Sequence, residues 1–247
     1  SATLSISKFM YLSGSIGFEQ ATYTDLKSGA AGTTIVPRAQ GFSVGGSNIT
    51  AFMGYAENGI DRSKTLQAQA SSLYGFGAEG ISFGLLSVKD LTGIKYTALK
   101  AQVSNVQVYG FDPADFQLSA SGVKFEYNRA SLVGRELNFA SSARQMAIPT
   151  GDVAQPVTLD FSGNRLGVFA SQVTLQLSQF MFVQGAIAFL KSDFTTLKAG
   201  GLPVATTLTP AKGFSMGGAD IDVFVGYASA GFDPSKTFAS QASTLYG

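Results

Sequence analysis

GFSVGGSNITAFMGYAENGIDRSKTLQAQASSLYG, residues 41–75, decides how this chain is organised, because the stretch occurs a second time. The second copy reads GFSMGGADIDVFVGYASAGFDPSKTFASQASTLYG, residues 213–247, at an offset of 172 positions. Of the 35 aligned positions, 21 are identical. Self-similarity at a fixed period is the sequence signature of repeat architectures. The two copies therefore predict a repeating structural unit.

The similarity continues upstream of both copies. SKFMYLSGSIGF at 7–18 resembles SQFMFVQGAIAF at 178–189, at an offset of 171. The middle of the chain occurs only once. We therefore expect about 1.4 turns of a longer tandem array, since stacked units bury a core that a single unit cannot bury. In this division, residues 1–75 are the C-terminal part of a preceding unit, 76–247 are one complete unit of about 172 residues, and 171–247 are equivalent to 1–75.

Composition excludes several classes of function. Charged residues make up 13% of the chain, against about 25% in an average protein. The 17 basic and 16 acidic residues form no basic stripe, so we expect no nucleic acid as a partner. Cys and His are both absent, which rules out Ser-His-Asp and Cys-His nucleophile systems and the common zinc sites. No apolar run is long enough for a transmembrane helix.

Apolar residues alternate with polar ones over short runs separated by turn-forming residues. Alternation of this kind, rich in β-branched and aromatic residues, indicates half-buried β-strands. We predict an all-β fold with little helix and an elongated tandem-repeat architecture, either β-solenoid-like or of stacked antiparallel sheets. In DRSKTLQAQASSLYG and its second copy we expect only a single helical turn. The alternating runs lie at 106–108, 116–120, 123–127 and 173–177, and the breaks at 28–32, 90–93, 110–113 and 162–164.

The alternation also slips by one residue at three places. A slip of this kind moves every later side chain to the other face of a sheet, and its usual cause is a β-bulge or a bend. We therefore predict a bulge at each place, the alternative being a strand buried on both faces. The slips separate Ile6 from Phe9, Ala120 from Val123 and Leu177 from Phe180.

Carboxylates are the remaining candidates for chemistry. Asp112 with Asp115, or Asp220 with Asp222, could in principle act as a glycosidase pair. The first pair lies in the turn-like GFDPAD, where Asp commonly caps backbone N–H groups, and the second aligns with Asn48 and Thr50 of the other copy. We therefore expect no catalytic residues, no cofactor-binding residues and no enzyme.

Calcium is the one cofactor that the sequence leaves open. Asp61 and Asp233 are equivalent between the copies and offer one carboxylate each, as a calcium ligand or as a helix or turn cap. Neither the EF-hand pattern nor the GGxGxD nonapeptide pattern is present. The cap is therefore the preferred interpretation of both residues.

Aromatic residues and glycines repeat in spacing between the two copies. Such positions favour packing within or between units, because stacked repeats bury the same face each time. An aromatic platform for sugars is the alternative. A phosphate-binding loop at the paired glycines is disfavoured, because apolar alternation follows instead of Gly-Lys-Ser/Thr. The packing or assembly candidates are Phe42, Gly45, Gly46, Phe52, Tyr55, Tyr74, Phe214, Gly217, Gly218, Phe224, Tyr227 and Tyr246.

Four segments together resemble a known group of proteins. They are GGSNITAFMGYA, LYGFGAEGISFGLLSVKD, YTALKAQVSNVQVYGFDPADFQLSAS and VTLDFSGNRLGVFASQVTLQLSQFMFVQGAIAF. The combination resembles tandem β-rich repeat units of giant bacterial extracellular surface proteins of the adhesin or matrix type. The resemblance implies an extended scaffold outside the cell or at the cell surface.

We therefore expect a structural protein that assembles with further copies of itself. The segment would belong to a long extracellular filament, adhesin stalk or matrix protein that self-associates head-to-tail through β-sheet packing. Cell-surface or matrix glycans are a second class of partner. Two alternatives remain open from the residues alone, namely an outer-membrane β-barrel and a carbohydrate-binding β-solenoid.

Overall fold

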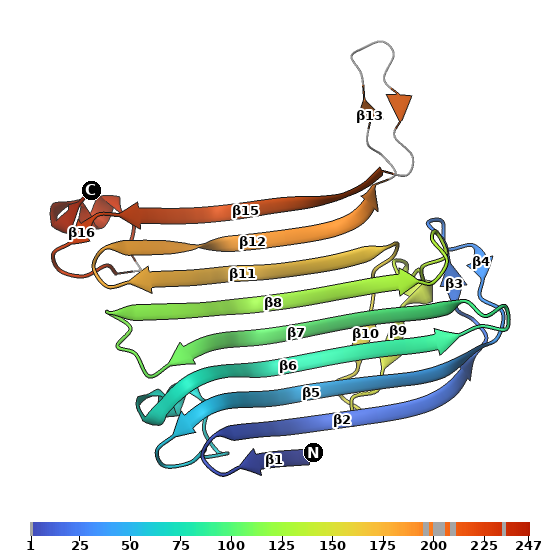
Figure 1. Ribbon diagram of the computed structural model, residues 1–247, viewed down its shortest axis with the longest axis horizontal. Coiled ribbons are helices and arrows are strands. Elements are labelled where there is room, and N and C mark those ends of the chain that lie inside the picture. The colour runs from blue at the N-terminus through green and yellow to red at the C-terminus, as the bar shows by residue number, and fades with distance from the viewer. Residues whose placement is uncertain (1, 195–197, 200–205, 208–210, 234–235) are drawn as a thin grey trace.

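Nine strands of the chain form one open antiparallel sheet in the computed structural model, which describes residues 2–194, 198–199, 206–207, 211–233 and 236–247 (Figure 1). Strands that follow one another along the chain lie side by side in the sheet, so it is a simple meander. In sheet order the strands are β1 (Ala2–Ile6), β2 (Met10–Tyr23), β5 (Ala39–Ala56), β6 (Leu73–Lys89), β7 (Lys95–Tyr109), β8 (Phe116–Ala130), β11 (Arg165–Leu177), β12 (Met181–Phe194) and β15 (Ala211–Val225).

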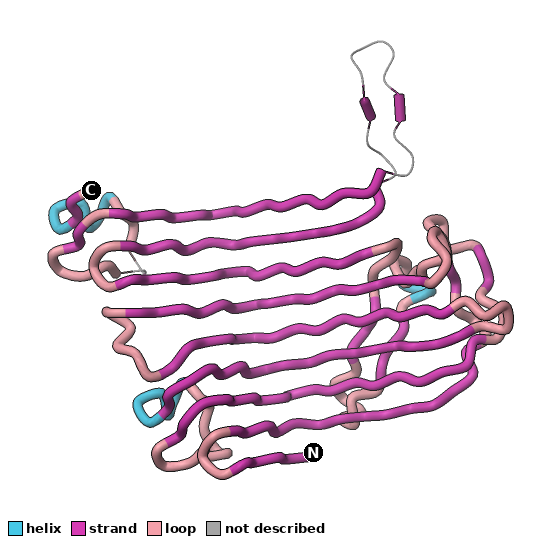
Figure 2. The backbone as a smooth tube through the Cα atoms, viewed as in Figure 1, coloured by secondary structure: helices cyan, strands magenta, loops and turns pink. Residues whose placement is uncertain are grey.

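Short elements fill the connections between the long strands (Figure 2). Most are two-stranded ribbons, and the three helical pieces are all short 3₁₀ turns. The predicted single helical turns are therefore confirmed at Gln67–Ser72 and Ala239–Thr244. The ribbons pair β3 (Lys27–Ser28) with β4 (Thr34–Ile35), β9 (Met146–Ile148) with β10 (Val157–Leu159), β13 (Lys198–Ala199) with β14 (Thr206–Thr207), and β16 (Tyr227–Ala228) with β17 (Leu245–Tyr246), and the third 3₁₀ turn is Ser142–Arg144.

A line of irregular pairing crosses the sheet near the middle of its long strands. On β5 and β15 the extra residues, Asn48 and Asp220, have φ angles of 52° and 50°. On β6 and β8 the irregular residues are Gly80 and Gly122, with φ angles of 64° and 56°. A Cβ on either glycine would collide with a serine of the next strand, so these positions suit glycine. We call this line the crease.

The crease explains one of the three slips in alternation. Ala120 pairs with Val106 and Val123 pairs with Val103 on either side of Gly122 in β8, so the apolar residues stay on one face. The predicted irregularity between Ala120 and Val123 is therefore confirmed. The other two predictions were wrong, because β1 and β11 end at Ile6 and Leu177 and the slips there are turns between strands.

One face of the sheet is covered and carries the main core. Odd-numbered residues of β2 share a face, and along it Tyr11 packs beneath residues 57–72 while Gly17 meets the backbone of Pro149 beside β9. We call this the covered face and its opposite the bare face. The largest cluster on the covered face lies between β5–β8 and the segments around β9 and β10, and comprises Leu26, Val36, Ala39, Leu86, Val88, Tyr96, Ala98, Ala130, Leu137, Phe139, Ile148, Leu159 and Phe161.

The expectation of an all-β, antiparallel structure with little helix is confirmed for the described part of the chain. The expected breaks at 90–93, 110–113 and 162–164 fall between long strands. The arrangement within the described residues is an open sheet; coils of a solenoid are not among its features, and the division at residue 75 stays a prediction.

Candidate association surfaces

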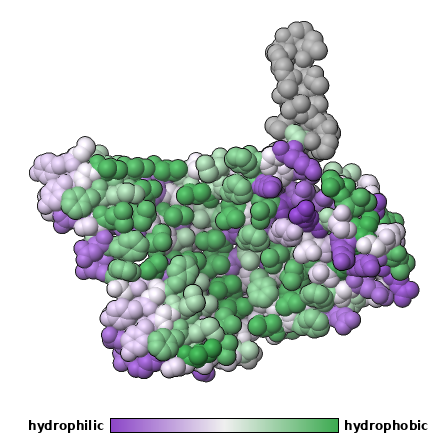
Figure 3. Space-filling view, viewed as in Figure 1, coloured by the Kyte–Doolittle hydropathy of each residue, from purple (hydrophilic) through white to green (hydrophobic). Residues whose placement is uncertain are grey.

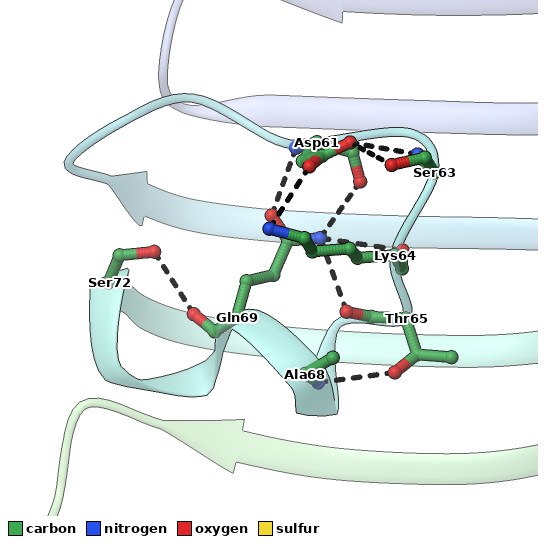
Figure 4. Close-up of polar contacts among 7 residues, drawn as sticks. All are labelled: Asp61, Ser63, Lys64, Thr65, Ala68, Gln69 and Ser72. Atoms are coloured by element: carbon green, nitrogen blue, oxygen red, sulfur yellow. Dashed lines mark hydrogen bonds and ion pairs between the residues drawn. The ribbon is translucent and has the colours of Figure 1, made fainter.

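Residues 57–72, the first insert, leave the sheet after β5 and return to it at β6 (Figure 4). The side chain of Gln69 holds the insert together, because its Oε1 accepts from the Asp61 N–H at 2.9 Å. Its Nε2 donates to the carbonyls of Asp61 at 3.0 Å and Thr65 at 3.2 Å. The Asp61 carboxylate accepts from the Ser63 N–H and hydroxyl at 2.9 and 2.7 Å. Asp61 is therefore a turn cap, as preferred from the sequence.

Residues 229–244, the second insert, repeat the contacts of the glutamine side chain. The Gln241 Oε1 accepts from the Asp233 N–H at 3.0 Å, and its Nε2 donates to the carbonyl of Asp233 at 3.1 Å and that of Lys236 at 3.2 Å. The ion pair between Lys236 and Asp233 spans 2.9 Å, against 3.3 Å between Lys64 and Asp61. The two segments with similar sequences thus have matched local structures.

Each insert covers a separate hydrophobic cluster on the covered face. The first cluster places Leu66 over Phe52 of β5 and Tyr109 of β7, all almost fully buried. The second places Phe232 against Phe182 of β12, with ring centroids 4.0 Å apart. Neither set of contacts was visible from spacing alone, although Phe52 was already a packing candidate.

The twelve packing candidates divide between the two faces. Pairing registers place the covered-face members on the insert side of the sheet and the others on the bare face. The paired glycines lie inside β5 and β15 next to the crease, and the pairing of β5 with β6 shifts register between Gly46 and Ile49. The covered-face residues are Gly45, Phe52, Gly217 and Phe224, and the bare-face residues are Phe42, Gly46, Tyr55, Tyr74, Phe214, Gly218, Tyr227 and Tyr246.

Ring contacts on the bare face are also matched between the two segments. Phe18 stacks on Phe42 with centroids 5.9 Å apart, and Phe189 stacks on Phe214 at 6.0 Å. Tyr55 lies 6.5 Å from Tyr74, and the equivalent tyrosines Tyr227 and Tyr246 lie 6.4 Å apart. Rings in these geometries are within the range of favourable aromatic pairing.

The β15 strand is an open edge of the sheet within the described residues. It pairs with β12 on one side, with the same irregularity beside Asp220 that β5 shows beside Asn48. On the side that is open in β15, β5 pairs with β6 from Gln40 to Ala56. Unpaired strand edges are templates for further strands.

The bare face is strongly apolar from one side of the sheet to the other (Figure 3). In Figure 1 β9 and β10 pass behind the long strands, so Figure 3 views the uncovered side. Met53 of β5 and Phe76 of β6 are 68% and 46% exposed. Exposed apolar areas of this extent mark interaction surfaces. Further exposed members are Leu4, Leu12, Ile16, Phe18, Phe42, Leu118, Val168, Leu177, Ile187, Phe214, Met216, Ile221, Val223 and Val225.

A polar trough lies on the covered face beside the first insert. Its volume is about 490 Å³, and amide and hydroxyl side chains of β7, β8, β11 and β12 form its floor. Glu79 is its one carboxylate, and that group accepts a hydrogen bond from the Leu66 N–H at 2.8 Å. The floor residues include Asn105, Gln107, Gln117, Ser119, Ser121, Gln172, Thr174 and Gln184.

Two tyrosines that are buried on the covered face have strongly raised pKa values. Burial raises the pKa of Tyr109 to about 12, with a further contribution from the Glu79 charge. Burial also raises the pKa of Tyr96 to about 12, assisted by its hydrogen bond of 2.9 Å to Asp90. Burial opposes ionisation of Asp90, yet hydrogen bonds from Thr92, Tyr96 and the backbone hold its pKa below the usual value. These groups stabilise the covered core.

The structure places the candidate carboxylate pairs of the sequence in a turn and in a bulged strand. Asp112 accepts from the Ala114 N–H at 2.9 Å in the turn between β7 and β8, and the Asp115 carbonyl accepts from the Ser178 N–H at 2.6 Å. Asp220 lies in the β15 bulge, and Asp222 pairs across from Gln184. Among the described residues, three or more His, Cys, Asp or Glu do not gather into a metal-binding group.

Comparisons with protein-family models, with curated proteins and with solved structures find no match for this chain. The described part of the chain also contains no helix long and apolar enough to cross a membrane. The function is therefore argued from the surfaces above.

Proposed function

We propose that this chain is a structural segment of an extended β-sheet at the cell surface that associates with further units through its open strand edges. The observation that carries the proposal is the match between β15 and β5. Both strands have a neighbour on one side in equivalent register, and within the described residues β6 pairs with the other side of β5, whereas that side of β15 is open.

The pairing of β16 with β17 supports the proposal. Leu245 pairs with Ala228 and Tyr246 with Tyr227. The equivalent residues at the start of β6, Leu73 and Tyr74, pair with Ala56 and Tyr55 in the same register. A strand added along β15 in the register of Leu245 and Tyr246 would thus repeat the β5–β6 pairing. Growth of a sheet by strand addition supplies backbone hydrogen bonds along the whole edge.

Individual N–H groups on this edge identify where to test it. The Gly226 and Ala228 N–H groups donate to carbonyls of the turn before β12, at 2.9 Å each. Because successive residues of an antiparallel strand bond to opposite neighbours, the Val223 and Val225 N–H groups point to the open side. Proline is tolerated on an edge strand when the N–H that it removes faces solvent.

The test compares Val223→Pro with Val223→Ala in the full chain by sedimentation velocity over a range of concentrations. We expect the parent and the alanine variant to associate, and the proline variant to associate about tenfold more weakly, because one edge hydrogen bond and the strand added there are lost. Negative-stain electron microscopy then distinguishes elongated assemblies from compact particles. Unchanged association of the proline variant, or a parent chain that stays monomeric at every concentration, refutes the proposal.

A further inference from the structure

We propose that the bare face of the sheet is a lipid-facing surface whose strands run across the hydrocarbon layer of a membrane. The proposal rests on the edge pairing proposed above, because open sheet edges do not occur in hydrocarbon. Three separate features of the bare face carry it, namely its uncharged centre, its two different rims and the length of its apolar band.

Apart from Asp220 in the bulge of β15, the strand residues that register places at the centre of the bare face carry no charge. Registers from Leu12 through Ala120 to Val223 place only apolar or small residues between the two ends of the strands. The one charged residue in the described bulges is Asp220 of β15. The charged strand residues near the middle, such as Glu79, Lys124 and Glu126, lie on the covered face. A charge facing acyl chains is costly, so this separation is what a lipid contact requires.

One rim of the bare face is aromatic. At the strand ends beside the two inserts, Phe9, Tyr55 and Tyr74 form a chain of ring contacts 5.8 and 6.5 Å long. The equivalent rings Phe180, Tyr227 and Tyr246 follow at 6.0 and 6.4 Å. Amphipathic tyrosine rings concentrate at the boundary between hydrocarbon and head groups.

The opposite rim is basic. Lys89 of β6, Lys95 of β7 and Arg129 of β8 fall on the bare face at the far strand ends, and Lys191 and Lys212 continue the row on β12 and β15. Asp193 is the single acidic residue of these strand ends on that face. Long basic side chains extend from apolar surface toward lipid phosphates, so the charge of this rim complements anionic head groups.

The apolar band between the rims is long enough to cross a bilayer core. On β8 it runs from Phe116 to Tyr127, just before Arg129. At roughly 3.3 Å per residue that stretch is about 36 Å long. With the strand tilt of about 45° typical of membrane-crossing strands, its height is about 26 Å, against an apolar band of about 25 Å in such proteins. If a second copy of the chain covered the bare face instead, the length of the band would not need to match the thickness of a bilayer.

Lys substitutions on neighbouring residues provide the first test. Leu118 lies inside the band, two residues from its Phe116 end, whereas Ser119 is adjacent on the same strand but in the polar trough of the covered face. We expect Leu118→Lys to weaken flotation with phosphatidylcholine vesicles containing phosphatidylglycerol by about tenfold or more, because a lysine faces acyl chains. Ser119→Lys should float like the parent. Circular dichroism verifies that both variants are folded.

Depth measurements provide the second test, and the chain has no native cysteine to interfere. Single variants Tyr74→Cys, Ala120→Cys and Arg129→Cys carry an environment-sensitive dye, and lipids with nitroxides at different depths quench it. We expect the strongest quenching by deep nitroxides at Ala120→Cys and shallow quenching at the two rims. Ser119→Cys should remain accessible to an aqueous quencher.

The outcomes separate this proposal from the edge proposal. Flotation of Leu118→Lys equal to that of the parent, or equal depths at both rims and the centre, overturns the lipid proposal. A parent chain that does not float but forms a dimer that Leu118→Lys dissociates also overturns it, since a second copy then covers the face. Val223→Pro keeps an apolar side chain on the bare face and reads out only the edge, so its sedimentation decides the edge proposal separately.

Discussion

The two inserts, residues 57–72 and 229–244, have the same hydrogen-bonded frame but different surroundings. In the first, β6 and β7 complete the cluster, because Leu73 and Tyr109 pack with Leu66 and Glu79 accepts from the Leu66 N–H. In the second, at the open edge, Phe238 takes the place of Leu66 and remains partly exposed. Its neighbours are aromatic, with the Phe232 ring 5.4 Å away.

The comparison shows that the glutamine hydrogen bonds within an insert and the hydrophobic packing of the insert on the sheet depend on different parts of the chain. The glutamine frame is local, since its bonds join residues within eight positions of one another. The hydrophobic cover depends on strands that lie further along the sheet. An insert at an edge therefore keeps its shape, but its apolar side chains stay partly exposed. Addition of a strand at the edge would bury them.

Substitution of the buried leucine should have the largest effect. Leu66 is 0% exposed, and Leu66→Ala should cost about 2–5 kcal/mol in the free energy of unfolding, because a cavity remains beneath the insert. Phe238→Ala should cost less, because Phe238 is only partly buried. Denaturant unfolding and hydrogen exchange of residues 67–73 measure the difference. Equal losses in the free energy of unfolding from both variants would mean that β6 and β7 add nothing to the packing of the first insert.

Removal of the glutamine frame should have the next largest effect. Gln69→Ala removes the hydrogen bond of the Asp61 N–H and those that Gln69 donates to the carbonyls of Asp61 and Thr65, at a cost of about 1–3 kcal/mol. Gln241→Ala should weaken the second insert to a similar degree, because its contacts are the same. The comparison is Gln69→Glu, which keeps the acceptor but replaces the two donors by a charged oxygen facing the same carbonyls, so it should weaken the insert at least as much. Hydrogen exchange in each insert reports the effect, and a loss confined to one insert would show that the frames are not equivalent.

The same two regions show how much of the structure the sequence predicts. Strand positions follow from alternation, which is a property of neighbouring residues, and the repeated QAS segments predict matched turns. The hydrophobic packing beneath the inserts could not be predicted, because Tyr109 is brought next to Leu66 only by the pairing of β6 with β7. The basic rim was equally hidden, since Lys89, Arg129 and Lys191 are far apart in the chain and meet only through register. At Ile6 and Leu177 the slip in alternation marks a turn rather than a bulge. The sequence does not distinguish the two, because each shifts the alternation of apolar residues by one position.

Alkaline titration should distinguish the two clusters by a smaller effect. Tyr109 belongs to the first cluster, whereas the described members of the second cluster include no tyrosine. Because the pKa of Tyr109 is raised to about 12 when folded, its contribution to stability is complete below about pH 10 and is lost as the pH rises toward 12. The first insert should therefore exchange hydrogen faster across this range, while the second changes little.

Absorbance of tyrosinate provides the direct readout for this prediction. Two late-titrating groups are expected, Tyr96 and Tyr109, and Tyr109→Phe should remove one of them. The same variant should abolish the alkaline response of the first insert. An unchanged late phase in Tyr109→Phe would contradict the assignment.

The smallest effect is expected at the ion pairs of the two turns. Lys64 and Asp61 are 58% and 46% exposed at the side chain, and Lys236 and Asp233 are 59% and 40% exposed. Exposed pairs are screened by salt and gain little over hydration. Lys64→Met and Lys236→Met should therefore leave the unfolding midpoint unchanged at both low and high salt. Asp61→Ala should act differently, because it also removes the acceptor for the Ser63 N–H and hydroxyl, the contact that holds the pKa of Asp61 below its usual value. A salt-dependent loss in either lysine variant would show that charge, and not the turn cap with its glutamine frame, holds the inserts in shape.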